Sequence, residues 1–171
     1  EVAARAGYEW LQVTPHPDFI PFFNHPKADS DLVKLFKKKA KDAGIGLAST
    51  LPVIRWSSPD ADAREAAVRY FKRVLQITQE LEIPYIGTEF SGRPEKAEES
   101  ERAFYRSMEE LIPLIEKSGV KVFIDPHPDD FVENGLAACA QVQATCHSVY
   151  KWQGKLESAT ESPIHFKTNE S

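Results

Sequence analysis

The chain has 171 residues, of which 42% are hydrophobic and 27% are charged, and its formal net charge is −5. This is enough for one domain with an ordinary core, and 8 glycines and 12 prolines exclude a collagen-like or low-complexity chain. With 2 cysteines it is no disulfide scaffold. No apolar run approaches the ~18 residues of a membrane helix, and the negative charge disfavours nucleic acid. We therefore predict a cytoplasmic protein that binds neither membranes nor nucleic acid.

A junction between a helix and a strand recurs along the chain at a nearly constant interval. The junctions at positions 7, 44, 82 and 119 are separated by 37, 38 and 37 positions. Each is followed by a short apolar strand, a polar loop and an amphipathic helix. The predicted strands are 8–13, 45–51, 83–87 and 120–124, and the predicted helices run from about 30 to 42, 58 to 81 and 94 to 117. Strands and helices alternating at this spacing predict a parallel sheet.

The repeat stops after four units. A fifth junction is due near residue 156, but no apolar strand follows it there. We predict an α/β fold in which residues 1–140 form about four to five units of a TIM-barrel type, and residues 141–171 form an irregular tail. A closed barrel needs eight units in ~250 residues, and the chain starts without Met, so we expect a longer parent protein. Open barrel edges predict a homo-oligomer.

The candidate functional residues follow the predicted strands, because parallel α/β folds bind ligands at the carboxyl ends of their strands. The candidates in chain order are His16, Arg55, Trp56, Glu89, Asp125 and His127. Carboxylate, imidazole and guanidinium groups on one face suit a small anionic or polyhydroxylated ligand. Carboxylate and imidazole also suit a divalent metal.

Several candidates also have a purely structural interpretation. Residues 125–128 can form a turn in which Asp125 caps the next helix. Glu89 can be a buried carboxylate that pairs with Arg55 or Arg93. His147 can line the site or belong to the irregular tail, and His16 can equally be a surface histidine.

Three segments resemble the sugar phosphate isomerase/epimerase family, the xylose-isomerase-like barrels. They are residues 7–12 (GYEWLQ), 88–92 (TEFSG) and 124–131 (IDPHPDDF), and the resemblance covers roughly residues 1–140. It implies a (β/α)8 barrel that acts on a sugar or sugar phosphate with one divalent metal (Mn, Mg or Co). By resemblance, Asp125 stands where the first metal ligand, commonly Glu, is expected, and His147 is a candidate second ligand. The ligands usual after the last two strands have no counterpart, so we expect this chain to bind the metal weakly or not at all.

The resemblance implies proton transfer next to a sugar carbonyl through an enediolate, which the metal would stabilise as a Lewis acid. Glu89 and Asp125 are the predicted catalytic carboxylates. The predicted substrate contacts are His16, Arg55, Trp56 and His127. Two alternatives stay open, namely a catalytically inactive truncated barrel and a subunit similar to the C-glycoside deglycosidases that acts on oxidised sugar conjugates. A nuclease similar to endonuclease IV is disfavoured, because 5 scattered histidines and a charge of −5 supply neither a three-metal cluster nor a basic groove.

Overall fold

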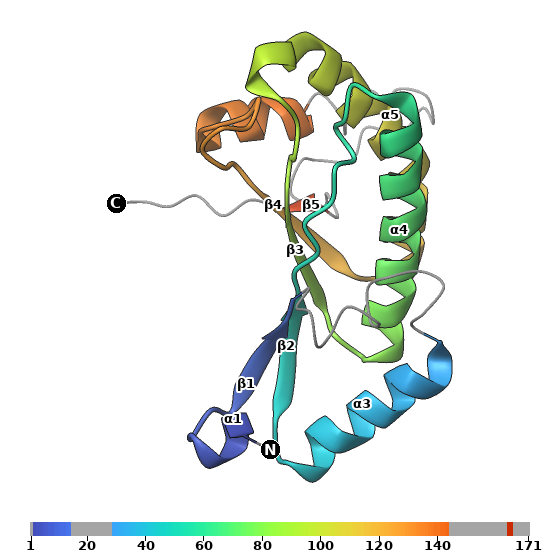
Figure 1. Cartoon of the computed structure of the whole chain (residues 1–171), viewed down its shortest axis with the longest axis vertical. Coiled ribbons are helices and arrows are strands. Elements are labelled where there is room, and N and C mark those ends of the chain that lie inside the picture. The colour runs from blue at the N-terminus through green and yellow to red at the C-terminus, as the bar shows by residue number, and fades with distance from the viewer. Residues whose placement is uncertain (1, 15–28, 144–163, 166–171) are drawn as a thin grey trace.

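The computed structural model describes residues 2–14, 29–143 and 164–165. Helices and strands alternate along these residues (Figure 1). In chain order the elements are α1 (Val2–Arg5), β1 (Trp10–Val13), α3 (Ser30–Asp42), β2 (Gly46–Thr50), α4 (Ala61–Glu80), β3 (Tyr85–Glu89), the 3-10 turn η1 (Pro94–Lys96), α5 (Ala97–Ser118), β4 (Lys121–Asp125) and β5 (Ile164–His165). Residues 135–143 are also helical. None of the helices within the described part of the chain combines the length and the apolar character needed to cross a bilayer.

The strands form one sheet in the order β1-β2-β3-β4-β5, and each adjacent pair is parallel. The predicted α/β fold with four to five barrel-type units is therefore confirmed. The short strand β5 lies within the segment predicted to be irregular, and its two residues pair with Val122 and Phe123 of β4. Two residues are too few to show alternation, so the sequence pattern did not reveal this strand.

The helix ends follow ordinary capping chemistry. The side chain of Asp29 accepts a hydrogen bond from the Leu32 amide at 2.8 Å and starts α3. The side chain of Asp60 does the same for Ala63 at the start of α4. The predicted start of this helix at Ser58 is therefore three residues before the observed first residue, Ala61, because the carboxylate of Asp60 provides the cap.

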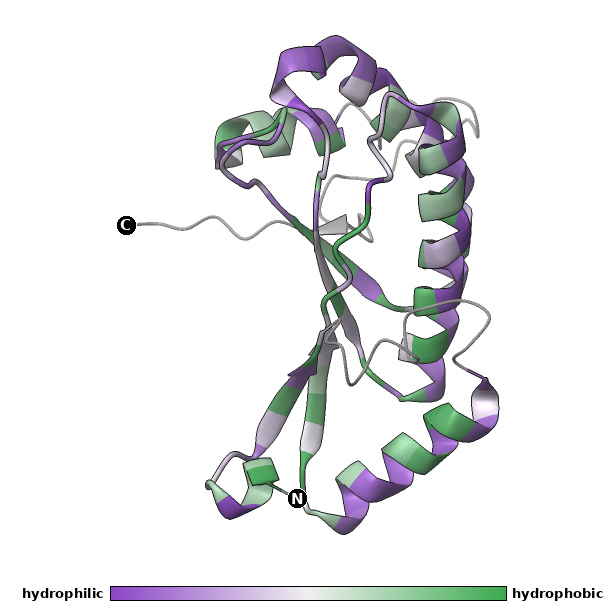
Figure 2. Ribbon diagram, viewed as in Figure 1, coloured by the Kyte–Doolittle hydropathy of each residue, from purple (hydrophilic) through white to green (hydrophobic). Residues whose placement is uncertain are grey.

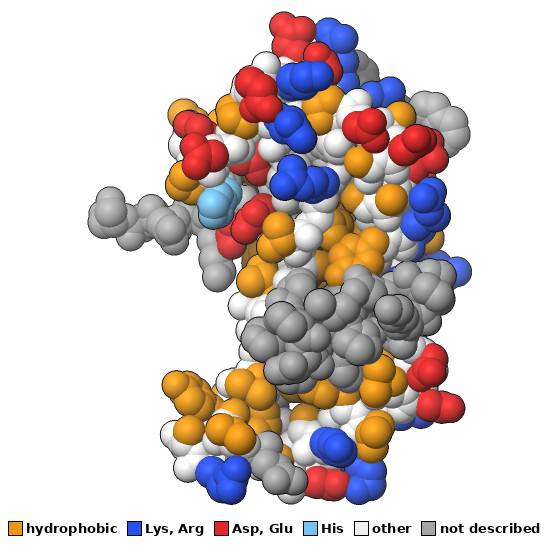
Figure 3. Space-filling view, viewed as in Figure 1, with side chains coloured by type: hydrophobic (Ala, Val, Ile, Leu, Met, Phe, Trp, Pro, Cys, Tyr) orange, Lys and Arg blue, Asp and Glu red, His pale blue; other side chains and the backbone are white. Residues whose placement is uncertain are grey.

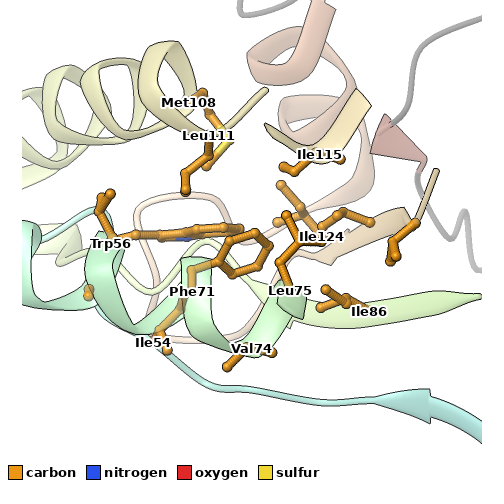
Figure 4. Packing of buried hydrophobic residues seen from close by; sticks show 14 of the residues in the cluster. Ile54, Trp56, Phe71, Val74, Leu75, Ile86, Met108, Leu111, Ile115 and Ile124 are labelled. Atoms are coloured by element: carbon orange, nitrogen blue, oxygen red, sulfur yellow. The ribbon is translucent and has the colours of Figure 1, made fainter. Parts of the chain in front are cut away.

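Helices α3, α4 and α5 cover one face of the sheet, and the hydrophobic core lies between the two layers (Figures 1 and 2). Residues of β3 and β4 alternate, so that Ile86 and Ile124 are fully buried against α4 and α5, as Figure 4 shows. The alternate residues of these strands, which include Glu89 and Asp125, are only partly buried. The two carboxylates therefore belong to the face of the sheet that the helices leave uncovered.

The uncovered face also carries exposed aromatic side chains near β1. Trp10 is 65% exposed, and its ring lies so close over Gly46 that a Cβ there would come within 2.3 Å of it. Tyr85, on the same face, contacts the ring of Phe123 with centroids 5.4 Å apart. Figure 3 shows exposed hydrophobic side chains gathered over α1 and β1, whereas charged side chains are more numerous at the opposite end of the molecule.

Candidate active site

The two predicted catalytic carboxylates end neighbouring strands. Glu89 is the last residue of β3 and Asp125 the last residue of β4, and the two are partners in the parallel register. Adjacent strands lie about 4.8 Å apart, so the two side chains leave the same face of the sheet as direct neighbours. The structure thus brings Glu89 and Asp125 together at the carboxyl edge of the sheet.

The loop after β2 holds the end of β3 in place. The Trp56 Nε1–H donates to the carbonyl oxygens of both Glu89 and Phe90, each at 3.0 Å. The Ser57 hydroxyl donates to the same Phe90 carbonyl. The backbone that carries Glu89 is therefore tied to a second strand-end loop.

Trp56 itself, predicted to contact substrate, lies wholly in the core. Its exposed fraction is 0%, and its ring centroid lies 5.0 Å from that of Phe71 and 6.2 Å from that of Phe104. Figure 4 shows the indole between α4 and α5. We therefore correct the prediction. The loop turns inward at this residue, which leaves Trp56 no surface to contact a ligand and makes it a support for Glu89.

The other predicted substrate contacts fall into two groups. Arg55 and His127 are exposed in the loops after β2 and β4. The Nδ1 atom of His127 lies 2.7 Å from the Pro128 carbonyl oxygen, which orients the ring. Both remain candidate substrate contacts, whereas His16 lies outside the described residues, as does the predicted metal ligand His147.

The loop after β4 contains a turn at residues 127–130, where the Asp130 amide donates to the His127 carbonyl oxygen at 3.1 Å. The capping and ion-pair alternatives for the two carboxylates are not observed. The helix at 135–143 is capped by Asn134, whose Oδ1 accepts from the Ala137 amide at 2.9 Å, so Asp125 does not cap it. Arg93 pairs with Glu95 at 3.4 Å. Within the described ranges no ion pair includes Glu89.

Asp130 is a buried carboxylate beside the site that the sequence analysis missed. It is 5% exposed, and it accepts hydrogen bonds from the backbone N–H groups of Ser91, Gly92 and Phe131. The first two belong to the loop after β3, and Asp130 belongs to the loop after β4. The sequence shows two adjacent aspartates at 129–130, and nothing in the local pattern says which of them turns inward.

The same two loops also pack closely through an aromatic side chain. A Cβ on Gly92 would lie 2.2 Å from a ring carbon of Phe131, so only glycine fits under this ring. Phe131 in turn meets Phe90 edge-on, with centroids 5.8 Å apart. Hydrogen bonds and ring packing therefore act together to join the loops that follow Glu89 and Asp125.

Ser91 is strained, and we expect Ser91→Gly to stabilise the protein. Its φ is 55°, and its buried hydroxyl has no hydrogen-bond partner among the described atoms. Glycine adopts a positive φ freely and removes the unpaired hydroxyl, so the free energy of unfolding should rise by about 1 kcal/mol. Urea unfolding measures this change. The matched variant Ser91→Ala keeps the Cβ and should gain less, and a loss of stability in Ser91→Gly would contradict the assignment of strain.

Several ionisable groups whose pKa values are shifted lie in the helical layer rather than beside Glu89 and Asp125. A hydrogen bond from Arg64 on α4, at 3.1 Å, lowers the pKa of Glu110 on α5. Burial raises the pKa of Tyr70 to about 12. Burial and the nearby charge of Glu101 raise the pKa of Tyr105. Glu110 joins α5 to α4 through Arg64, and Tyr105 joins α5 to the helix at 135–143 through Gln141 at 2.6 Å, so these two groups support the scaffold of the site.

A metal site requires more ligands than the described residues bring together. No group of three or more His, Cys, Asp or Glu side chains in residues 2–14, 29–143 and 164–165 is placed to hold a metal ion. Glu89 and Asp125 offer carboxylate oxygens from two residues only, whereas zinc sites take three or four protein ligands and the expected metal set also includes a histidine. The predicted ligand His147 is outside these ranges, so the described residues do not fit a complete metal site.

A parallel β–α sheet with its polar residues at the carboxyl ends of the strands, in the sequential strand order β1 to β5, is typical of barrel-type α/β proteins. The sequence profile of the xylose isomerase-like TIM barrel matches residues 1–153. The chain therefore belongs to the xylose isomerase-like TIM barrel family. No curated protein matches it.

Solved structures of sugar epimerases are similar to this chain. A D-psicose 3-epimerase studied in the presence of D-fructose has a TM-score of 0.65 at 20% identity, over 85% of this chain and 52% of that one. D-Psicose 3-epimerase from Clostridium cellulolyticum H10 with D-tagatose has a TM-score of 0.68 at 17% identity, and the match covers 96% of this chain and 54% of that one. A xylose isomerase-like TIM barrel protein from Mycobacterium smegmatis in complex with magnesium has a TM-score of 0.62 at 14% identity, and the match covers 85% of this chain and 51% of that one. The chain thus spans about half the length of these proteins, and such identities show a common fold alone.

Proposed function

We propose that the chain contributes to isomerase- or epimerase-type chemistry on a sugar or sugar phosphate. The observation that carries this proposal is the placement of Glu89 beside Asp125 at the carboxyl ends of adjacent strands. Membership of the xylose isomerase-like family supports it, as do neighbours of known fold that act on ketoses. The exposed guanidinium of Arg55 would suit a phosphate group on such a substrate.

In the proposed reaction one of the two carboxylates removes the proton from the carbon next to the sugar carbonyl. The electron pair of the broken C–H bond forms the C=C bond of the enediolate, and the carbonyl π electrons move to its oxygen. A carboxyl group then returns a proton to carbon, and the carbonyl re-forms. Because the described residues do not fit a complete metal site, none of these steps is assigned to a metal.

Exchange of the substrate proton with solvent tests this proposal directly. The 171-residue chain is incubated in D2O with D-fructose, D-psicose or D-tagatose and with their phosphates, each with and without Mn²⁺ or Mg²⁺. We expect ¹H NMR to show loss of the proton next to the carbonyl faster than in the absence of protein. No exchange with any of these sugars would contradict the proposal and favour a catalytically inactive chain.

We also propose that the chain self-associates through the uncovered face near β1. β1 pairs only with β2 in the described sheet, so one row of its backbone groups is available to another strand. The exposed Trp10 beside it adds apolar surface of the kind that forms contacts between subunits.

Replacing Trp10 should therefore weaken this association. We expect Trp10→Lys to shift the mass measured by size-exclusion chromatography with light scattering toward the monomer, because a charge replaces the apolar contact. Leu35→Lys is the matched control, since Leu35 is also exposed, at 48%, but lies on α3 of the helical layer. A mass that is unchanged by Trp10→Lys would contradict this interface.

A further inference from the structure

The carboxylate of Asp130 joins two loops that the backbone does not otherwise connect at this point. One oxygen accepts from the Gly92 amide at 2.7 Å, and the other accepts from the Ser91 amide. These amides lie two and three positions after Glu89, whereas Asp130 lies five positions after Asp125. These hydrogen bonds therefore connect the segment that follows Glu89 directly to the segment that follows Asp125.

Asp130 is itself held firmly within its own loop. Its amide donates to the His127 carbonyl oxygen at 3.1 Å, and the His127 amide donates to the Val132 carbonyl oxygen at 3.3 Å. The same Asp130 oxygen that binds Gly92 also accepts from the Phe131 amide at 2.7 Å. The carboxylate is thus a fixed point between the loops, and a movement of either loop would break a buried hydrogen bond.

Register pairing alone leaves the last residues of two strands free to fray, since no further ladder bonds follow them. Glu89 and Asp125 are such terminal residues. On one side Glu89 is fixed by Trp56, which binds its carbonyl oxygen. Asp130 supplies the corresponding restraint between β3 and β4, and it is 5% exposed, so water competes little for these bonds.

We propose that Asp130 is a positioning residue that sets the separation of the Glu89 and Asp125 side chains by joining the loops after β3 and β4. This inference rests on the proposed function for its catalytic consequence, because only an enzyme that uses both carboxylates needs their spacing. The restraint itself is a property of the fold and is testable without any activity.

The isosteric variant Asp130→Asn tests the proposal. An amide group keeps the size of the side chain, but its NH2 end faces backbone N–H groups and cannot accept their bonds. We expect amide hydrogen exchange at Ser91 and Gly92 to accelerate by about tenfold or more, with unchanged protection in α4 and α5. We also expect the carboxyl ¹³C shifts of Glu89 and Asp125 to move. If the chain catalyses proton exchange, kcat should fall by about tenfold or more while KM changes by less than about twofold.

Asp129→Asn is the matched control. Asp129 is the exposed neighbour with a φ of 65°, a conformation that asparagine tolerates well, so this variant makes the same chemical change in the same loop without altering the hydrogen bonds of Asp130 to Ser91 and Gly92. It should leave amide exchange, carboxyl shifts and kcat as they are in the parent chain.

The outcomes separate this inference from the proposed function. Unchanged exchange at Ser91 and Gly92, unchanged carboxyl shifts or an unchanged kcat in Asp130→Asn would each overturn the positioning role. Loss of protection throughout the sheet and helices would also overturn it, because Asp130 would then act on global stability. If the parent chain shows no proton exchange with any sugar, the proposed function fails, while the amide and carboxyl measurements still decide whether Asp130 positions the two side chains.

Discussion

Trp56→Ala is expected to lower the free energy of unfolding by about 4 kcal/mol, measured by urea denaturation, because it empties a large volume at the centre of the core. Trp56 is 0% exposed and packs against Phe71 and Phe104. The variant also removes the N–H group that binds the carbonyl oxygens of Glu89 and Phe90. The loss should therefore be among the largest that a single substitution in this chain can cause.

Two further variants separate the contributions to this loss. Trp56→Phe keeps most of the apolar volume but removes the N–H donor, so it should cost less than Trp56→Ala, at about 2 kcal/mol. Arg55→Ala changes the exposed neighbour and should stay within about 0.5 kcal/mol of the parent chain. A Trp56→Ala variant as stable as Arg55→Ala would show that the indole is not part of the core.

Removing either carboxylate of the candidate site should reduce proton exchange by about 100-fold or more, the usual contribution of a positioned acid or base. Glu89→Gln and Asp125→Asn keep the shape of each side chain while removing its ability to take up a proton. The measurement is the rate of deuterium incorporation next to the carbonyl of the sugar that the parent chain turns over fastest.

The exposed Glu133 provides a control for this comparison. Glu133→Gln makes the same chemical change in the loop after β4 without altering the pair, and its exchange rate should equal that of the parent chain. Urea unfolding of all three variants checks that they remain folded. If Glu89→Gln and Asp125→Asn both retain the full rate, the two carboxylates are not the catalytic groups and the proposed function loses its main support.

The part of the site that was predictable from sequence is the part that follows from strand position. Asp125 comes directly after the predicted strand 120–124 and Glu89 two positions after the predicted strand 83–87, and parallel strands place such residues at one edge. Trp56 occupies the same kind of position after its own strand but turns into the core. The direction of a loop side chain cannot be predicted from hydrophobic periodicity, because loops have none. The rule that placed the two carboxylates at the sheet edge therefore gave a wrong prediction for Trp56, namely that it contacts substrate.

By itself the sequence determined the repeated β–α units, the parallel sheet and the strands that lead to Glu89 and Asp125, because hydrophobic periodicity and junction spacing are local properties. Only the tertiary structure decided that Asp130, and not Asp129, turns inward, that Trp56 supports Glu89, and that Ile164–His165 extend the sheet. Each of these depends on atoms that are distant in the chain. Their positions are set by how the loops pack against one another, and no short stretch of sequence contains that information.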